Sequence, residues 1–283
     1  MSYYSQPAQN PGFQPQGGNP NYGWNQQPAG GPPPQAGGQY HSVPAYNNGA
    51  DPESGKYDIQ FSDATIRAAF VRKVFTLVGI MLGVVAVMCA VPYLHQDTML
   101  FAQQNRWLFW VSYGTFFVTY LALVCCESVR RSFPGNLIMT GIFTLASGWL
   151  TMMLTIQLQI ESVLLCVIIT ALSCGSIVLF AMFTKKDLTS YIGVLAVISI
   201  FLFMFGLVAV IATVAFHARL LYTVYAGMAA LVMLGWLAID IQMMMGGRKY
   251  EISPEDHIFA ALQIFLDILQ FFWMLLAIFG NNN

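Results

Sequence analysis

The chain has 283 residues, of which 57% are hydrophobic and only 9% are charged, and its formal net charge is −1. A soluble domain carries about 25% charged residues, so this composition cannot cover a globular surface with charge and predicts a membrane protein. The near-zero net charge also argues against the clustered basic surface that nucleic-acid binding requires, and we expect no nucleic-acid partner.

Residues 1–56 differ in composition from the rest, because they contain ten of the thirteen prolines together with Gly, Gln, Asn and Tyr. Such a segment buries too little apolar surface to offset its chain entropy, so we predict a disordered tail. We expect no signal peptide there, since a basic start and an apolar stretch are both missing. Two interpretations stay open: a proline-rich docking segment for a partner domain, or a solvated tail.

From Phe70 onward the chain is a series of apolar runs, each near the roughly 20 residues that a membrane helix needs. We therefore predict an all-α membrane domain over residues 57–283, a bundle of seven transmembrane helices whose short loops make neighbouring helices antiparallel. The predicted spans are residues 70–94, 107–126, 134–156, 161–183, 188–213, 219–245 and 257–279.

Basic residues are distributed unequally between the two sets of predicted loops. One side carries ten of the twelve and the other carries only Arg106 and Arg219. The excess of Lys and Arg in cytoplasmic loops predicts a cytosolic N-terminal tail in an integral multi-pass protein. Seven spans then place the C-terminus on the opposite side, unless the last segment is re-entrant.

Two acidic residues lie inside apolar runs, Asp240 in the sixth predicted span and Asp267 in the seventh. Ionisable groups within membrane helices are costly and indicate a functional site by default. Neither has a Lys, Arg or His within one helical turn. The rise of about 1.5 Å per residue puts both at similar depths, which allows contact across a helix hairpin.

Two carboxylates that are close together in a low-dielectric interior cannot both ionise without a large free-energy cost, so they titrate as a unit and respond to protons. When deprotonated, the same oxygens suit transient binding of Ca²⁺, which prefers oxygen ligands. The alternative is that each aspartate is simply hydrogen-bonded within the bundle. Arg130 and Arg131, at the cytosolic end of the second span, are the nearest cationic partners, although positive-inside anchoring also accounts for them.

Two polar stripes follow helical spacing. Gln263 and Gln270 share one face of the last span with Asp267 and are candidates for a polar lining. The third span carries a second stripe, formed by Thr140, Thr144, Ser147, Thr151 and Thr155. This stripe is open to two interpretations, a pore lining or tight helix packing through small residues.

The sequence predicts no enzyme and no resident cofactor. None of the four histidines lies in the middle of a span, which argues against a membrane metal hydrolase. No G-x-S-x-G nucleophile elbow and no P-loop is present. The five cysteines lie in or beside apolar runs, which fits neither a disulfide framework nor a zinc ribbon.

An ordered set of short motifs resembles one known family. The motifs are Arg72-Lys73-Val74-Phe75, Cys125-Cys126, residues 130–136 (Arg-Arg-Ser-Phe-Pro-Gly-Asn), residues 183–190 (Phe-Thr-Lys-Lys-Asp-Leu-Thr-Ser), residues 252–256 (Ile-Ser-Pro-Glu-Asp) and Leu266-Asp267-Ile268. Over about residues 62–279 the chain is similar to the Lifeguard branch of the transmembrane Bax-inhibitor-motif family. Many relatives have Asp-Thr-Gln where this chain has Asp240-Ile241-Gln242, so a nearby hydroxyl is lost.

The resemblance implies a seven-helix bundle of the Bax-inhibitor type that leaks Ca²⁺ from an intracellular store and dampens cell death. It implies a pH-sensing pair that falls on Asp240 and Asp267, and an arginine latch that falls on Arg130 or Arg131. A pH-sensitive Ca²⁺ leak channel of an ER, Golgi or plasma membrane, opened by acid, is therefore the expected function. The alternatives are a membrane scaffold for death-receptor or Bcl-2-type partners, and a proton-coupled transporter, for which no convincing inverted repeat is visible.

Overall fold

The computed structural model describes the backbone of residues 52–280 and the side chains from Asp63 onward. Most of the predicted tail of residues 1–56 therefore lies outside the described residues. The described elements are α1 (Pro52–Leu94), α2 (Gln96–Gln104), α3 (Trp107–Cys125), α4 (Glu127–Arg131), α5 (Gly135–Thr155), α6 (Ile160–Phe183), η1 (Thr189–Tyr191), α7 (Ile192–Phe216), α8 (Arg219–Met245) and α9 (His257–Gly280).

The described part of the chain is helical without strands, and seven of its helical segments are long and apolar enough to cross a membrane. The prediction of an all-α membrane bundle with seven spans is confirmed, and most span boundaries agree within three residues. The largest difference is at the first span, because the helix that contains it begins well before residue 70. Helix α1 itself starts at Pro52, a residue type favoured at the first helical position.

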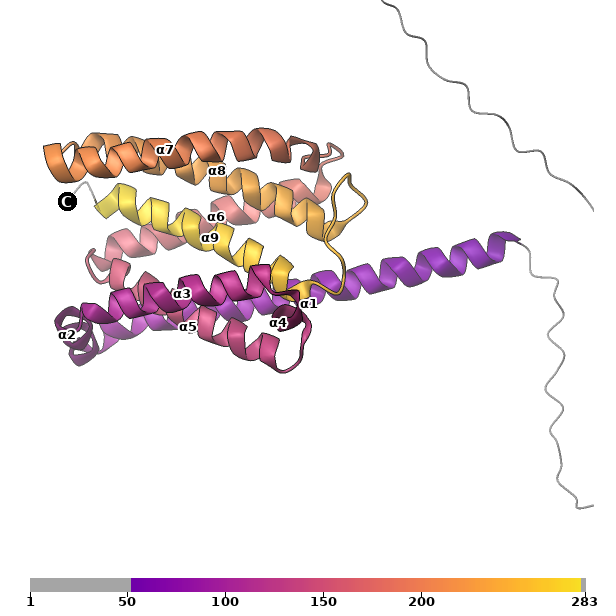
Figure 1. Ribbon diagram of the computed structural model, residues 1–283, viewed down its shortest axis with the longest axis horizontal. Helices are drawn as coiled ribbons and strands as arrows, with labels where there is room; N and C mark the ends of the chain where they lie inside the picture. Colours follow the sequence, from indigo (N-terminus) through magenta and orange to yellow (C-terminus); the bar gives the residue numbers. More distant parts are fainter. Residues whose placement is uncertain (1–51, 281–283) are drawn as a thin grey trace, which may run out of the picture. The chain divides into compact units, whose positions relative to one another are not determined.

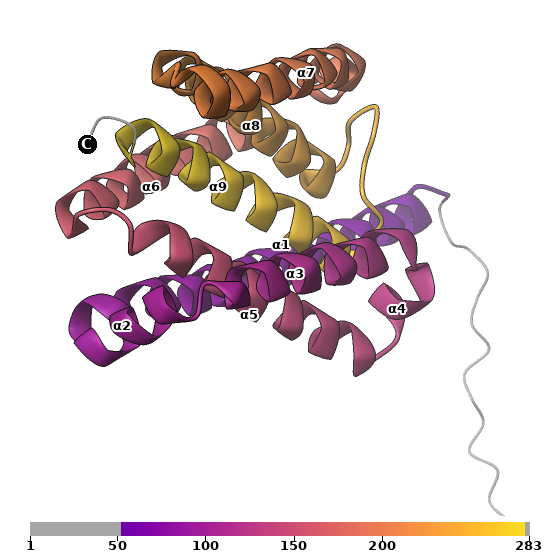
Figure 2. The ribbon, with the colours of Figure 1, turned by 60° about the vertical axis from the view of Figure 1, so that its left-hand side comes forward.

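Helix α9 lies in the middle of the bundle, between α6 and α8 on one side and α1, α3 and α5 on the other (Figures 1 and 2). It packs against α1, α5, α6 and α8. Small and apolar side chains of α9 fill this position, among them Ala260, Ala261, Phe265 and Leu276, which are each at most 4% exposed. The last span is therefore positioned to couple the two groups of helices.

Burial divides the spans into a core set and a peripheral set. In α5, α8 and α9 at least half of the most apolar window is buried within the protein, against 11–22% in the other spans. Helix α7, the most hydropathic span, packs mainly on α8 and exposes large side chains such as Phe201 and Ile211. Since lipid is as apolar as these side chains, exposure of this kind is expected on the bilayer-facing surface.

Two glycines permit close helix approach inside the bundle. A Cβ atom added at Gly148 of α5 would overlap the Met88 sulfur of α1, and one at Gly206 of α7 would lie 2.6 Å from the Tyr225 ring of α8. Small residues at such crossings bring membrane helices together and strengthen their van der Waals packing.

Candidate functional site: an aspartate pair beneath a charged loop

The two aspartates that the sequence singles out face each other across α8 and α9. Asp240 is 2% exposed, and its side chain lies within hydrogen-bonding distance of the Asp267 side chain. The neighbours along the chain are apolar, and both Ile241 and Leu266 are buried in the core. The hairpin of α8 and α9 thus joins two carboxyl groups in an apolar part of the bundle.

A direct hydrogen bond between the two carboxyl groups needs a proton, because an ionised carboxylate can only accept. Among the described residues, no Lys, Arg or His side chain forms an ion pair with Asp240 or Asp267. Tyr120 of α3 and Cys174 of α6 are titratable neighbours of Asp267, and neither is basic. No basic side chain among the described residues therefore neutralises a negative charge on this pair.

One carboxyl oxygen of the pair, the buried Asp267 Oδ2, has no hydrogen-bond partner among the described residues. Buried polar atoms are nearly always satisfied, so an orphaned carboxyl oxygen requires an explanation, such as an exchanging proton or a transient ion. The described residues hold no group of three or more His, Cys, Asp or Glu side chains that could bind a metal. Two carboxyl groups suit brief contact with a hard cation better than a resident metal site.

Arg130 and Arg131 do not contact the aspartate pair in this conformation. Both bind Asp256, immediately before α9: Arg130 Nε lies 3.1 Å from Oδ1, and Arg131 donates to both carboxylate oxygens at 3.0 Å. Arg130 also lies over the Phe259 ring. The hydrogen bond from Arg131, followed by that from Arg130, lowers the pKa of Asp256 below its usual range despite partial burial. The expected arginine partner of Asp240 is thus engaged by another acid.

The segment that carries Asp256 differs locally from the sequence-based expectation. Ser-Pro-Glu-Asp at residues 253–256 is a pattern typical of a helix start, but these residues form a turn and α9 begins at His257. The Ser253 side chain accepts from the Glu255 backbone N–H at 3.4 Å, and the Ser253 carbonyl accepts from the Asp256 N–H. The turn places Asp256 against the two arginines rather than within the first helical turn.

The remainder of the α8–α9 loop, residues 246–256, is anchored to α1. Arg67 of α1 donates to the Ile252 carbonyl at 2.7 Å and forms an ion pair with Glu251 at 3.1 Å. Glu251 also accepts from the Gly247 backbone N–H. Gly246 and Gly247 both have positive φ, a region in which side chains are strained, so the glycine pair allows the chain to turn sharply after α8.

A second set of contacts joins this loop to the α6–α7 connection. The Arg248 guanidinium donates to the carbonyls of Thr184 and Lys185. Asp187 accepts from Thr189, Ser190 and the Lys249 backbone N–H, and the bond from the Thr189 hydroxyl is the main cause of its lowered pKa. The loop is therefore held at several points across the end of the bundle that we call the basic end.

Gln242 links the two layers of the site. Two residues beyond Asp240 and 1% exposed, it accepts from the Leu188 N–H at 2.7 Å and donates to the Lys186 carbonyl at 2.9 Å. These bonds tie α8 to the α6–α7 connection just beneath the charged loop. The sequence analysis assigned Gln242 no role. An amide side chain two residues from an acid in an apolar span was the feature that could have indicated one.

The hydroxyl stripe of the third span is buried and used within its own helix. Thr140, Thr144, Ser147 and Thr151 each donate to the carbonyl four residues earlier, and Thr155 donates three residues earlier. Thr151 also accepts from the indole N–H of Trp273 on α9 at 3.0 Å. These contacts favour helix packing over a pore lining.

The two glutamines on the Asp267 face behave differently from that stripe. Gln263 and Gln270 are only partly buried, and neither side chain hydrogen-bonds to another described residue. Their amides are therefore free to solvate an ion or a water on the face of α9 that carries Asp267. They remain candidates for a polar lining.

Comparisons with known proteins agree with this architecture. Residues 67–283 match the family described as "Inhibitor of apoptosis-promoting Bax1". The chain is 35% identical to human Protein lifeguard 3 and 34% identical to its mouse counterpart, in each case over 79% of this chain and 72% of the relative. It is 24% identical to Arabidopsis thaliana Protein LIFEGUARD 4 over 80% of this chain and 90% of that protein.

No solved structure matches the chain significantly. The family match covers the whole α-helical part from Arg67, including both aspartates, both arginines and the α8–α9 loop. Together with the seven spans, these matches show that the chain is an integral multi-pass membrane protein that belongs to the Bax-inhibitor family, among relatives named lifeguard.

Proposed function

We propose that this protein is a pH-sensitive Ca²⁺ leak channel of an intracellular membrane, such as the ER or Golgi, and that it lowers stored calcium and dampens apoptosis. The observation that supports it best is the Asp240–Asp267 contact: Asp240 is buried, neither acid has a basic partner among the described residues, and the buried Asp267 Oδ2 is unsatisfied. Such a pair holds a proton when it is closed and offers oxygen ligands to a cation when it is not. We expect no enzymatic activity and no resident cofactor.

In this proposal the structure corresponds to a closed state with two barriers. The proton-sharing pair occupies the apolar middle of α8 and α9. At the basic end, which we place in the cytosol with the N-terminal tail, Arg130 and Arg131 hold Asp256 and so fix the start of the helix that carries Asp267. The latch would thus act on Asp267 through α9 rather than by direct contact with Asp240.

Calcium flux from liposomes that contain the purified full-length protein tests the proposal. Asp240→Asn and Asp267→Asn remove the titratable groups but keep the side-chain size, and we expect each to abolish most of the change in flux between neutral and acid pH. Asp97→Asn, an exposed acid on α2, is the matched control and should behave as the wild type. Unchanged flux and unchanged pH response in both pair variants would overturn the channel proposal.

The description of the family favours one alternative, a membrane scaffold that binds death-receptor or Bcl-2-type partners without its own channel activity. Deletion of residues 1–56 separates the two functions. If protection from cell death disappears while Ca²⁺ flux persists, the scaffold is the correct interpretation; if both persist, the tail is dispensable and the channel explains protection.

A further inference from the structure

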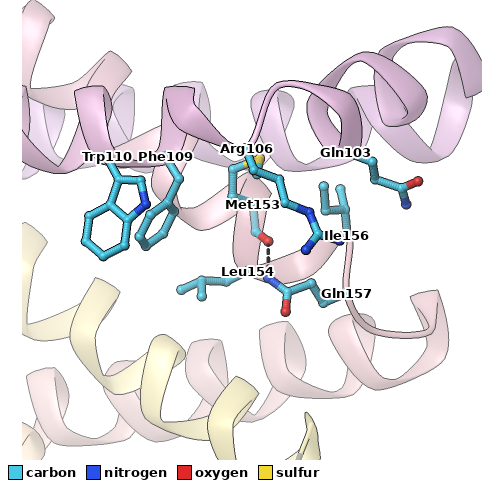
Figure 3. A pocket seen from close by; sticks show the side chains of 8 residues that line it. All are labelled: Gln103, Arg106, Phe109, Trp110, Met153, Leu154, Ile156 and Gln157. Atoms are coloured by element: carbon cyan, nitrogen blue, oxygen red, sulfur yellow. Dashed lines mark hydrogen bonds between the residues drawn. The ribbon is translucent and has the colours of Figure 1, made fainter.

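One cavity of the described part of the chain lies far from the aspartate pair, at the end of the bundle opposite the basic end. It has a volume of about 650 Å³ and is open to the outside. The connection between α2 and α3 forms one wall, and the C-terminal end of α5 forms the other (Figure 3). Its lining residues are Gln103, Arg106, Phe109, Trp110, Met153, Leu154, Ile156 and Gln157.

Arg106 is the only charged residue of this lining, and it is unusual for its side of the protein. Ten of the twelve basic residues belong to the other loops, so a cation here is not explained by the orientation rule. Its guanidinium extends across the cavity toward α5 (Figure 3). Among the described residues no acid or carbonyl pairs with it, although a guanidinium offers five donors.

Neutral donors surround this guanidinium. Neither the Gln103 amide nor the Trp110 indole N–H donates to a described residue, and Gln157 is held in place by a 2.8 Å bond to the Met153 carbonyl. One cation together with uncommitted amide and indole donors is a site for an anion that accepts several hydrogen bonds. A guanidinium matches the paired oxygens of a phosphate particularly well.

The position of the cavity identifies the source of that anion. Trp107 and Trp110 are 61% and 71% exposed at the start of the second span, and exposed tryptophans at the end of a span mark the headgroup level of a bilayer. The α5 wall adds the apolar side chains of Met153, Leu154 and Ile156 beside Gln157. A cavity that combines polar donors with apolar side chains at this level fits a lipid headgroup and the start of its acyl chains.

We propose that this cavity binds the phosphodiester headgroup of an anionic phospholipid from the leaflet at this end of the bundle, with Arg106 as the principal ligand of the phosphate. The site is independent of the proposed channel, because it rests on a different cavity and different helices. Bound lipid would bridge the α2–α3 connection and the end of α5, and so stabilise that end of the bundle.

Native mass spectrometry of the full-length protein in neutral detergent tests this assignment. The probe is phosphatidylglycerol, titrated to give a dissociation constant. We expect Arg106→Gln to raise that constant about tenfold, which is the effect of losing one charged hydrogen-bonding partner, and Arg106→Lys to raise it less. Arg219→Gln, which removes the other basic residue predicted for this side outside the cavity, should bind as the wild type.

Two further titrations identify the source of the anion. Inorganic phosphate up to a large excess should not displace phosphatidylglycerol, and phosphatidylcholine should bind more weakly. Wild-type affinity in Arg106→Gln, or an equal loss in Arg219→Gln, would overturn the site. Efficient displacement by inorganic phosphate would overturn the lipid assignment in favour of a soluble anion.

Discussion

Asp256 and Asp267 belong to the same part of the chain but have opposite surroundings. Asp256, just before α9, accepts hydrogen bonds from two arginines, which stabilise its negatively charged carboxylate form. Asp267, farther along the helix, faces another carboxyl group, and its Oδ2 has no hydrogen-bond partner among the described residues. The first arrangement fixes structure, because charge-assisted hydrogen bonds to a paired carboxylate stabilise the folded state. The second conflicts with stability and is therefore best explained by function.

The same contrast applies to the α8–α9 hairpin, whose loop at the basic end differs from its apolar middle. At the basic end, ion pairs and backbone contacts anchor the loop to α1, α3–α4 and the α6–α7 connection. In the apolar middle, the aspartate pair is a polar link between α8 and α9 among otherwise apolar contacts of the described residues. A change in protonation of the pair would thus act on helices that are fixed at one end and free to separate farther along.

The largest effect on stability should come from Asp256. We expect Asp256→Asn to reduce the free energy of unfolding by about 2 kcal/mol, because Arg130 is left partly buried without its carboxylate. Thermal unfolding of the purified protein in detergent measures the loss. Asp267→Asn at neutral pH should change stability little, since an amide can replace a protonated carboxyl group as a hydrogen-bond donor.

Glu255→Gln serves as the control for the loop, because the Glu255 side chain is 75% exposed and its contact with Arg131 should contribute little. If Asp267→Asn proved as destabilising as Asp256→Asn, the pair would be a structural element like the loop. The contrast between the two sites would then disappear.

The sequence predicted the parts of this arrangement that depend on hydropathy. Spans, antiparallel order and the depths of Asp240 and Asp267 all follow from apolar runs and helical rise, so the seven helices were predictable. The partner of Arg130 was not, because a loop turn decides where Asp256 points. The sequence suggested the first turn of a helix there, which would have given the acid a dipole to interact with instead of two guanidinium groups.

Acid should remove the contribution of Asp256 to stability in a defined pH range. The pKa of Asp256 lies below its ordinary value of 3.8 in the folded protein, chiefly because Arg131 and then Arg130 donate to it. Its contribution to stability is therefore complete above about pH 3.8 and is lost as the pH falls through the lower folded-state value. The difference in melting temperature between wild type and Asp256→Asn should shrink below that pH.

Asp187, the other acid near the loop whose pKa is lowered, is present in both the wild type and Asp256→Asn. Its contribution to the pH dependence therefore cancels in the difference between their melting temperatures. A difference in melting temperature that stayed constant down to the lowest accessible pH would show that Asp256 stabilises the loop without its charge. The hydrogen bonds alone would then explain the anchoring.

The smallest predicted effect distinguishes the two arginines, between which the family resemblance does not choose. The Arg130 side chain is 17% exposed, lies over Phe259 and also donates to the Val124 carbonyl, whereas Arg131 is 38% exposed and shares its charge with Glu127 and Glu255. Solvent screening weakens the second pair although its geometry is bidentate. In double-mutant cycles with Asp256→Asn, we expect a coupling of about 1.5 kcal/mol for Arg130→Gln and a smaller coupling for Arg131→Gln. The reverse order would make Arg131 the residue that fixes the start of α9, and bidentate geometry rather than burial would then determine the strength of the latch.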